Sequence, residues 1–426
     1  MRLHNLLASR KGRIAAFFLM YLTEGLPIGF AMTTVATQLR RQGTGAAEIG
    51  AFLGLVLLPW AFKWAYGPFV DLIASERLGP RRGWILGAQA MMVITLLPLA
   101  GLDLATQLGL FTALLVVHNL CGAVQDVAVD ALAVTTLQED ERAFASGMMF
   151  GGQSLGVLLG GGGALLLMGR VGFQAGIVVL ALIIAAVMSL VVLPMREAAS
   201  EPHAAAGMAA AGQEVLAFLR QALQALLGSR LALAGLLFGL LPISAMALAR
   251  GLQSNLAVDL GLSNGQIGWL ATASQAATAV TCIVGGWLSD RVNLRRAMAV
   301  YVGALSLPGL YLMFELQRQG WSPGQAVPAG LVTVFMAAVV IYQLLFGFIY
   351  GARVALFIGI TQPAVAATQF AAYMALTNLS ITYSVVWQGY AVQHWGYVAT
   401  LGLDALIGLS CLLVLPFLKP RKPKAS

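Results

Sequence analysis

Charge is the scarcest property of this sequence. Asp, Glu, Lys and Arg make up 10% of its 426 residues, whereas hydrophobic residues make up 59%. A soluble core of this length cannot hide so much apolar surface, so the composition excludes a soluble protein. The three cysteines all lie in apolar runs, which excludes a disulfide framework and a cysteine metal site. Because no catalytic His/Asp cluster appears either, we expect neither an enzyme nor a bound cofactor.

The net charge of +8 does not indicate binding to nucleic acid. The basic residues are scattered over short loops and both ends of the chain, and they form no single stripe. If the N-terminus is cytoplasmic, the segments expected outside contain only Arg40, Arg41, Arg170 and Arg318. This positive-inside bias predicts a multi-pass protein of the bacterial inner membrane with both termini in the cytoplasm.

The long apolar runs show no period-2 alternation, so they predict helices, which satisfy their own backbone hydrogen bonds in lipid. Each span needs about 20 residues. We predict an all-α membrane protein with twelve spans, at residues 14–39, 48–70, 84–101, 108–133, 143–168, 175–195, 231–258, 266–288, 297–315, 328–357, 369–389 and 398–418. Two pseudo-symmetric six-helix halves, 1–195 and 231–426, are expected, joined by a cytoplasmic linker at 196–230 with an amphipathic helix.

A basic loop follows the second predicted span and recurs after the eighth. Its two copies contain Gly67, Asp71, Arg81 and Arg82, and Gly286, Asp290, Arg291 and Arg295. The repeated loop resembles the signature loop of the major facilitator superfamily. That resemblance implies alternating access, with a substrate site between the halves near the middle of the membrane. Asp and Arg at helix ends can pair across the halves, so we expect these residues to act in gating.

Four stretches narrow this resemblance. They are Tyr21–Pro27, Pro59–Asp71, Gln125–Ala131 and Ala367–Phe370. Together they are similar to the AmpG muropeptide permease family and its relatives, which include acetyl-CoA transporters and siderophore permeases of the rhizobactin and pyochelin type. The resemblance implies proton-driven import across the inner membrane. The seventh span departs from it, because Ala, Met and Leu surround Ala245 where an AmpG-type helix carries an acidic residue.

Ionisable side chains inside a span cost at least a few kcal/mol each, and they persist mainly where they pair or line a polar cavity. Glu24 lies near the middle of the first span, where a carboxyl group can carry the coupled proton. The alternative is a structural hydrogen bond at the break that Gly25 and Pro27 would make.

Asp126 and Asp130 are four residues apart, so they share one face of the fourth span. Lys63 has a similar expected depth and can pair with Asp126. One ammonium cannot neutralise both carboxylates, which predicts that one of them exchanges a proton. A permanent buried salt bridge between the helices is the alternative.

Arg250 is expected near the middle of the seventh span, where a guanidinium suits a carboxylate or phosphate of the substrate. Its alternative role is an ion pair with Glu24. Further polar and aromatic groups at membrane depth are predicted either to bind substrate or to join helices by hydrogen bonds. These are His118, Asn119, Gln125, Gln153, Gln253, Tyr342, Asn378, Tyr383, Trp387 and Gln388.

The sequence therefore favours a monomeric proton-coupled importer of an anionic organic solute such as a muropeptide. Its expected partners are a small-molecule substrate, protons and the lipid bilayer. A siderophore or ferric-siderophore permease is the main alternative, followed by an exporter and a membrane signal transducer.

Overall fold

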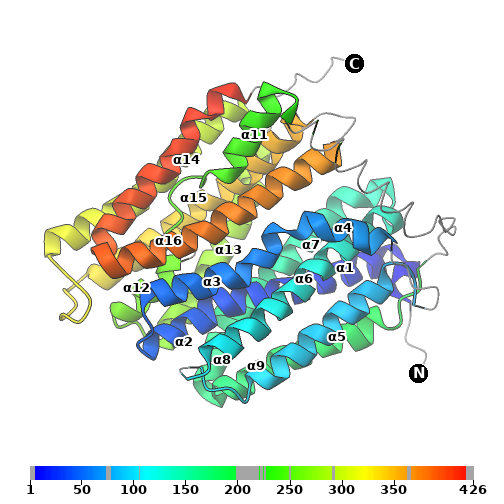
Figure 1. Ribbon diagram of the computed structural model, residues 1–426, viewed down its shortest axis with the longest axis horizontal. Helices are drawn as coiled ribbons and strands as arrows, with labels where there is room; N and C mark the ends of the chain where they lie inside the picture. Colours follow the sequence, from blue (N-terminus) through cyan, green and yellow to red (C-terminus); the bar gives the residue numbers. More distant parts are fainter. Residues whose placement is uncertain are drawn as a thin grey trace. The chain divides into compact units, whose positions relative to one another are not determined.

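The regular elements of the described chain are helices (Figure 1). The computed structural model describes residues 5–72, 78–104, 106–197, 220, 224, 227–248, 251–289, 293–361 and 366–418. The chain forms two compact units. Unit 1 comprises residues 1–39 and 55–215, and unit 2 comprises residues 40–54 and 216–426. The predicted division into two halves and a linker stays a prediction.

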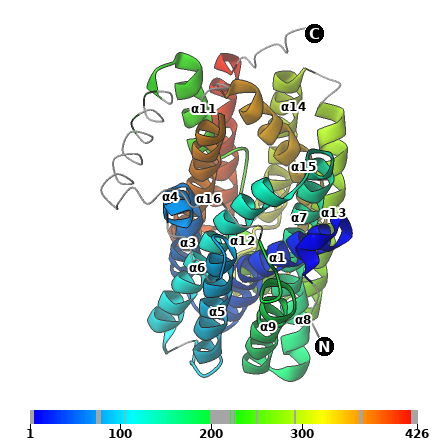
Figure 2. The same cartoon turned by 90° about the vertical axis from the view of Figure 1, so that its right-hand side faces the viewer.

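Nine helices cover the described residues between Arg10 and Val187. They are α1 (Arg10–Gly29), α2 (Ala36–Arg41), α3 (Ala46–Ala61), α4 (Lys63–Leu72), α5 (Arg82–Leu99), α6 (Leu108–Thr136), α7 (Glu139–Leu158), α8 (Ala164–Val171) and α9 (Phe173–Val187). π-helical turns continue three of them, at Phe30–Val35, Leu159–Gly163 and Met188–Val192. In unit 1, α5 packs against both α6 and α9 (Figure 2).

Close packing of α1 on α7 is the main contact of unit 1. A Cβ atom built on Gly25 would lie 2.1 Å from the carbonyl oxygen of Gln153, and one on Gly156 would lie 2.1 Å from that of Leu22. Only glycine lets the two backbones approach so closely. This contact brings Gln153 beside Glu24.

Six helices follow in unit 2. They are α11 (Arg230–Leu240), α12 (Gly251–Asp259), α13 (Asn264–Ser289), α14 (Leu294–Gln319), α15 (Leu331–Ile360) and α16 (Ala366–Leu409). Short 3-10 turns follow α16 at Ser410–Leu413 and Leu415–Phe417. Gly396, with φ 76° and ψ 174°, interrupts α16 between the predicted eleventh and twelfth spans.

The predicted seventh span, 231–258, is wrong as one continuous helix. Helix α11 ends at Leu240, residues 241–248 are not helical, and α12 begins at Gly251. Ser244 lies in this break with a positive φ of 66°. The break is buried, since residues 242–248 are all inaccessible to solvent. Backbone groups that leave a helix inside a membrane protein need other partners, and the neighbouring helices supply them here.

Eight helices of the described chain are long and apolar enough to cross a membrane, while Ala46–Ala61 and Arg230–Leu240 are shorter apolar helices. Large apolar side chains such as Leu182 and Leu406 are 61% and 68% exposed. In water such exposure would be unfavourable, whereas lipid is a good solvent for it. The chain is therefore a multi-pass membrane protein, and the count of twelve spans stays a prediction.

Candidate functional site

Three acidic side chains and one lysine meet in unit 1, and we call them the carboxylate cluster: Glu24, Asp126, Asp130 and Lys63. Glu24 comes from α1, the two aspartates come from α6, and Lys63 begins α4. Lys63 follows a local break, since Pro59 lies inside α3 and Phe62 donates to the Pro59 carbonyl oxygen at 3.2 Å. The structure thus brings together all four ionisable residues that the sequence singles out in this part of the chain.

Glu24 is 1% exposed. Gln153 Nε2 donates to its Oε1, while its Oε2 is buried and has no hydrogen-bond donor among the described residues. Asp126 comes within hydrogen-bonding range of Glu24. Two carboxyl groups can share a hydrogen bond only if one of them carries a proton. Glu24 therefore lies beside a second acidic side chain, with one of its own oxygens unpartnered among the described residues.

The two aspartates have different partners. Lys63 Nζ pairs with Asp126 Oδ2, and the Tyr21 hydroxyl donates to Asp130 Oδ1. The Asp126 side chain is 3% exposed and that of Lys63 is 30% exposed. Asp126 and Lys63 both act electrostatically on Asp130. Three carboxylates therefore share one ammonium, which leaves a negative surplus that a bound proton can reduce.

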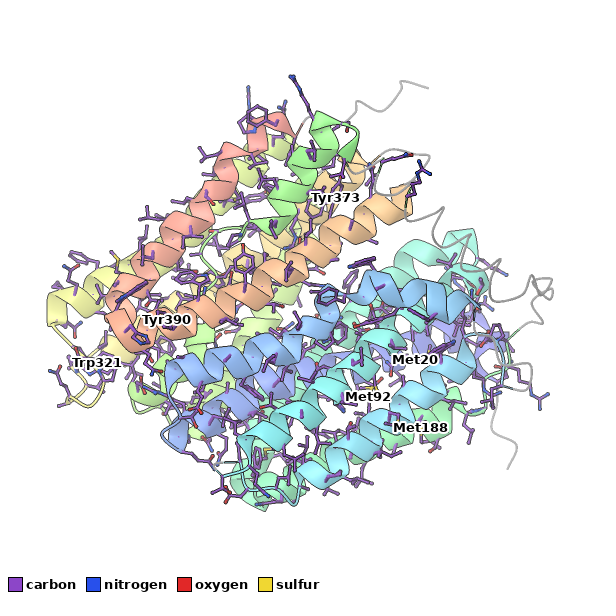
Figure 3. All side chains as sticks on the ribbon, viewed as in Figure 1. Met20, Met92, Met188, Trp321, Tyr373 and Tyr390 are labelled. Carbon is purple, nitrogen blue, oxygen red and sulfur yellow. The ribbon has the colours of Figure 1, made fainter. Side chains whose placement is uncertain are left out.

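Gln125 joins α6 to α1 beside this cluster. Its Nε2 donates to the Met20 carbonyl oxygen at 2.9 Å and to Thr23 Oγ1 at 3.0 Å. Gln89 Nε2 of α5 donates to the same hydroxyl at 3.2 Å. Figure 3 places Met20 in unit 1. Gln125 thus fixes α1 opposite α6, which keeps the cluster residues within reach of each other.

His118 and Asn119 are both buried and hydrogen-bonded inside unit 1. The imidazole Nδ1 lies 3.1 Å from Thr95 Oγ1 and 3.0 Å from the carbonyl oxygen of Met92, a residue labelled in Figure 3. Asn119 Oδ1 accepts from Trp60 Nε1 at 3.1 Å. These contacts join neighbouring helices, which is the structural alternative stated for both residues.

Several of the polar residues named for unit 2 support the break in the seventh span. Tyr342 donates to the Ala245 carbonyl oxygen at 2.7 Å, and Tyr383 donates to that of Leu240 at 2.6 Å. Gln388 Nε2 donates to Asp404 Oδ1 at 2.6 Å. Gln253 lies in α12, while Asn378 and Trp387 lie in α16.

Asp404 is a buried carboxylate that sequence reasoning missed. It is 2% exposed, and its Oδ2 accepts from the Ala247 amide at 2.8 Å. With Gln388 it has two donors among the described residues. The signal was available, since Asp404 is an acidic residue inside an otherwise apolar predicted span. Tyr21, whose hydroxyl donates to Asp130, was also missed, because an uncharged tyrosine is not conspicuous in an apolar span.

The described gating residues contact their own unit. The Arg81 and Arg82 amides donate to the Glu197 carboxylate, and Arg82 Nε donates to the Val192 carbonyl oxygen at 3.2 Å. Arg295 Nη1 donates to the Pro416 carbonyl oxygen at 3.4 Å, and Gly67 lies in α4. Outside the described part lie Asp290, Arg291 and Arg250, and the side-chain surroundings of Asp71 and Gly286.

Comparison with known proteins identifies the family. The profile of the Major Facilitator Superfamily matches residues 14–252 and 243–426. The anhydromuropeptide permease of Escherichia coli (strain K12) is 28% identical over 392 residues, covering 90% of this chain and 75% of that protein. Putative transporter AmpG 4 of Rickettsia conorii (strain ATCC VR-613 / Malish 7) is 26% identical over 158 residues, covering 36% of this chain and 38% of that protein.

Solved structures share the fold at low sequence identity. The D-xylose-proton symporter superposes with a TM-score of 0.71 at 13% identity, covering 94% of this chain and 96% of that one. A POT family transporter superposes with a TM-score of 0.68 at 12% identity, covering 95% of this chain and 96% of that one. The chain therefore belongs to the Major Facilitator Superfamily and is an AmpG-like permease, a multi-pass membrane transporter.

Proposed function

We propose that this transporter is a proton-coupled importer of an anionic organic solute of the muropeptide class. It works by alternating access across the bacterial inner membrane, as a monomer with both termini in the cytoplasm. The similarity to the anhydromuropeptide permease of Escherichia coli supports the solute class. The observation that carries the proton coupling is the carboxylate cluster, in which three acidic groups share one lysine.

Electrostatics supports a role in proton transfer. If Glu24, Asp126 and Asp130 were all ionised, two negative charges would stay unbalanced in a poorly solvated part of the protein. Unbalanced buried charge is costly, and protonation is the simplest way to remove it. The Lys63 side chain, 30% exposed, gives the cluster a route to solvent for the exchange of that proton.

We assign different roles to the three carboxyl groups. Glu24 carries the coupled proton, because its Oε2 has no donor among the described residues and Asp126 lies within range. Asp126 has a mixed role, since it also holds the Lys63 ammonium. Asp130, which accepts from Tyr21, is the second candidate for the proton.

Transport by purified protein in liposomes tests this assignment. Glu24→Gln removes the titrating group and keeps a hydrogen-bonding amide, so uphill uptake driven by a pH gradient should vanish while counterflow exchange persists. Asp404→Asn is the matched control, because it changes a buried carboxylate outside the cluster and should slow uptake and counterflow together.

Two results would contradict this assignment. If Glu24→Gln still concentrates the solute, and a protonophore abolishes that accumulation, Glu24 is not the coupling site and Asp130→Asn becomes the decisive variant. If both variants retain proton-driven accumulation, the proposed coupling through the cluster is wrong.

A thermal-shift screen of the purified protein tests the solute class. A ligand that binds the folded state raises the unfolding temperature in a concentration-dependent way. We expect an anhydromuropeptide to raise it and a coenzyme A ester and a ferric siderophore to leave it unchanged. An increase in unfolding temperature with the ferric siderophore alone would contradict the muropeptide class and would favour a siderophore permease, the main alternative. Arg250→Ala should weaken the shift, as the predicted partner of an anionic group.

A further inference from the structure

Residues 40–54 pack with unit 2 although the chain on both sides of them belongs to unit 1. We call them the crossover segment. They contain the end of α2, a short connection and the first part of α3. In the predicted topology the connection lies on the outer side of the membrane, with Arg40 and Arg41 among the few basic residues there.

A bidentate ion pair holds the beginning of the crossover segment. Arg40 Nε donates to Asp259 Oδ1 at 2.8 Å and Arg40 Nη2 donates to Asp259 Oδ2 at 2.7 Å. The Tyr397 hydroxyl donates to the same Oδ2 at 2.7 Å. Asp259 is the last residue of α12, and Tyr397 follows the interruption of α16 at Gly396. This fork-to-fork geometry is the one that a guanidinium adopts with a free carboxylate ligand.

Next to this ion pair, the crossover segment donates hydrogen bonds to uncharged acceptors. Arg41 Nε donates to Asn264 Oδ1 at 2.6 Å, and its Nη2 donates to the Leu262 carbonyl oxygen at 2.5 Å. The Ala47 amide donates to Gln393 Oε1 at 3.0 Å. The ion pair of Arg40 is therefore the one fully charged contact described between the crossover segment and its surroundings.

Further along, α3 meets α16 through glycine. A Cβ atom on Gly50 would lie 2.6 Å from the Val385 carbonyl oxygen, and one on Gly389 would lie 2.4 Å from that of Ala46. This contact involves backbones and few side chains, so it contributes packing without interlocking side chains. Among the described contacts of the segment, the charge-assisted hydrogen bonds between two ionised groups therefore lie at Arg40.

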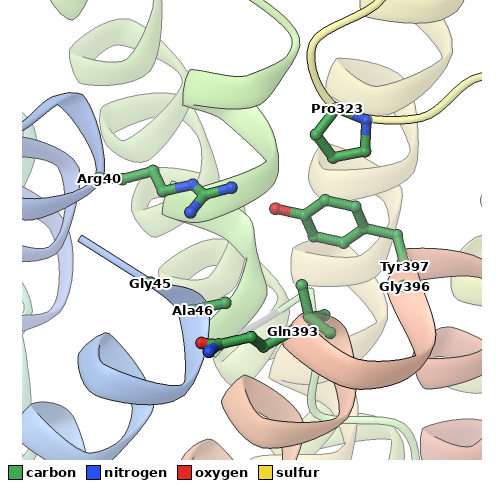
Figure 4. A pocket seen from close by; sticks show the side chains of 8 residues that line it. Arg40, Gly45, Ala46, Pro323, Gln393, Gly396 and Tyr397 are labelled. Atoms are coloured by element: carbon green, nitrogen blue, oxygen red, sulfur yellow. The ribbon is translucent and has the colours of Figure 1, made fainter. Parts of the chain in front are cut away.

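A cavity of about 350 Å³ opens beside this ion pair, with Arg40, Gln393 and Tyr397 among the residues on its wall. Figure 4 shows the Arg40 guanidinium and the Tyr397 hydroxyl pointing toward each other, with Gln393 and Ala46 nearby. The volume lies at the lower end of the range of small-molecule pockets, so part of a solute fits beside the guanidinium.

We propose that Arg40 is the outer docking site for a carboxylate of the incoming solute, and that Asp259 is its internal substitute. In the closed arrangement Asp259 occupies the guanidinium fork. A solute carboxylate in the cavity displaces Asp259 from Arg40, binds the fork and releases the crossover segment. This proposal rests on the proposed import of an anionic solute, and it adds the residue that first recognises the anion.

Opposite effects of the two partners distinguish docking from a simple latch. Uptake of a radiolabelled anhydromuropeptide is measured in liposomes. Asp259→Asn removes the competing carboxylate and should lower the KM for uptake several-fold, whereas Arg40→Gln removes the site and should raise it by roughly tenfold. If Arg40 only latches the segment, either change breaks the same pair and both shift KM in the same direction.

A charge swap adds a second readout. Arg40→Asp combined with Asp259→Arg should restore the protection of amides 40–47 against hydrogen exchange but should leave KM high, because the guanidinium has moved to α12. Recovery of both properties would overturn the docking role. Arg41→Gln is the control, since its guanidinium has neutral partners and KM should stay within about twofold.

A third experiment changes the solute and leaves the protein variants the same. An anhydromuropeptide whose carboxyl groups are amidated should lose the difference between wild type and Arg40→Gln, and a persisting difference would overturn the assignment. Absence of uptake by the wild-type protein would instead contradict the proposed function. Single variants that act alike on an active transporter contradict only the docking site.

Discussion

Unit 1 and unit 2 each bury carboxyl groups in membrane-spanning helices, but they solvate them very differently. Among the described residues, Glu24, Asp126 and Asp130 each accept a hydrogen bond from one other side chain, and they lie close enough to act on each other's charge. Asp404 accepts two hydrogen bonds, from the Ala247 amide and from Gln388, and among the described residues no ionisable side chain acts on its charge.

The difference indicates what each site can do. A carboxylate whose two oxygens accept from a backbone amide and from a side-chain amide has fixed partners, so it suits a structural anchor. A group of carboxylates with few donors and a surplus of charge is stabilised by gaining a proton, so it suits a reversible proton site. Burial alone does not separate the two cases, whereas the number of donors and the local charge balance do.

The largest expected effect comes from Lys63→Met, which leaves the three acidic groups of the carboxylate cluster without their cation. At neutral pH the free energy of unfolding should fall by roughly 3–5 kcal/mol, the usual cost of breaking a buried pair from one side. Because the folded variant then needs additional protons, its stability should rise as the pH falls. Thermal unfolding in detergent between pH 8 and pH 5 measures this dependence.

The double variant Lys63→Met with Asp126→Asn is the control. It removes both charges of the pair, so it should recover much of the lost stability and show a weaker pH dependence than Lys63→Met alone. If acidification does not stabilise the single variant, the cluster does not take up a proton to replace the missing cation.

A smaller loss is expected for Asp404→Asn. The new side chain keeps one neutral acceptor oxygen in place of two charged ones, so the charge-assisted hydrogen bonds from the Ala247 amide and from Gln388 are weakened or lost, and stability should fall by about 1–3 kcal/mol. Hydrogen exchange should accelerate at residues 244–248. Unlike the loss in Lys63→Met, this loss should not be reversed by acid, because no surplus of negative charge is created. Reversal by acid would remove the distinction between the two regions.

The sequence predicted the regions of high apolarity and the members of the carboxylate cluster. Charged residues such as Glu24 and Lys63 are conspicuous in an apolar sequence, and helical spacing places Asp126 and Asp130 on one face.

Other features depend on contacts that one sequence does not reveal. The hydropathy of residues 241–248 favours a helix, and Pro242 is a local signal for its interruption. What holds the break open, however, is Asp404, Tyr342 and the backbone of Gly408, which come from later parts of the chain. The pair of Arg40 and Asp259 was missed for the same reason, since 219 residues separate its members. Long-range partners decide both features, and local periodicity contains no information about them.

The smallest effect is expected at Glu141, near the beginning of α7. Its carboxylate pairs with a guanidinium, whereas the carboxylate of Asp404 accepts hydrogen bonds from uncharged amides. Arg13 Nε donates to Glu141 Oε2 at 2.9 Å, and the Arg13 guanidinium holds the pKa of the Glu141 carboxyl below its usual value of 4.5. A lowered pKa in the folded state stabilises the protein above pH 4.5, and this contribution is lost as the pH falls through the folded-state pKa. Glu141→Gln should therefore lower the unfolding temperature slightly at pH 7, and the difference from wild type should shrink below about pH 4.5. Arg13→Gln should produce a similar small loss, and the double variant should add little to either change, because all three variants remove the ion pair between Arg13 and Glu141. If the difference in unfolding temperature between wild type and Glu141→Gln grows on acidification, the folded protein stabilises the neutral form of Glu141. Glu141 would then behave as a proton-binding group and not as the charged partner of Arg13.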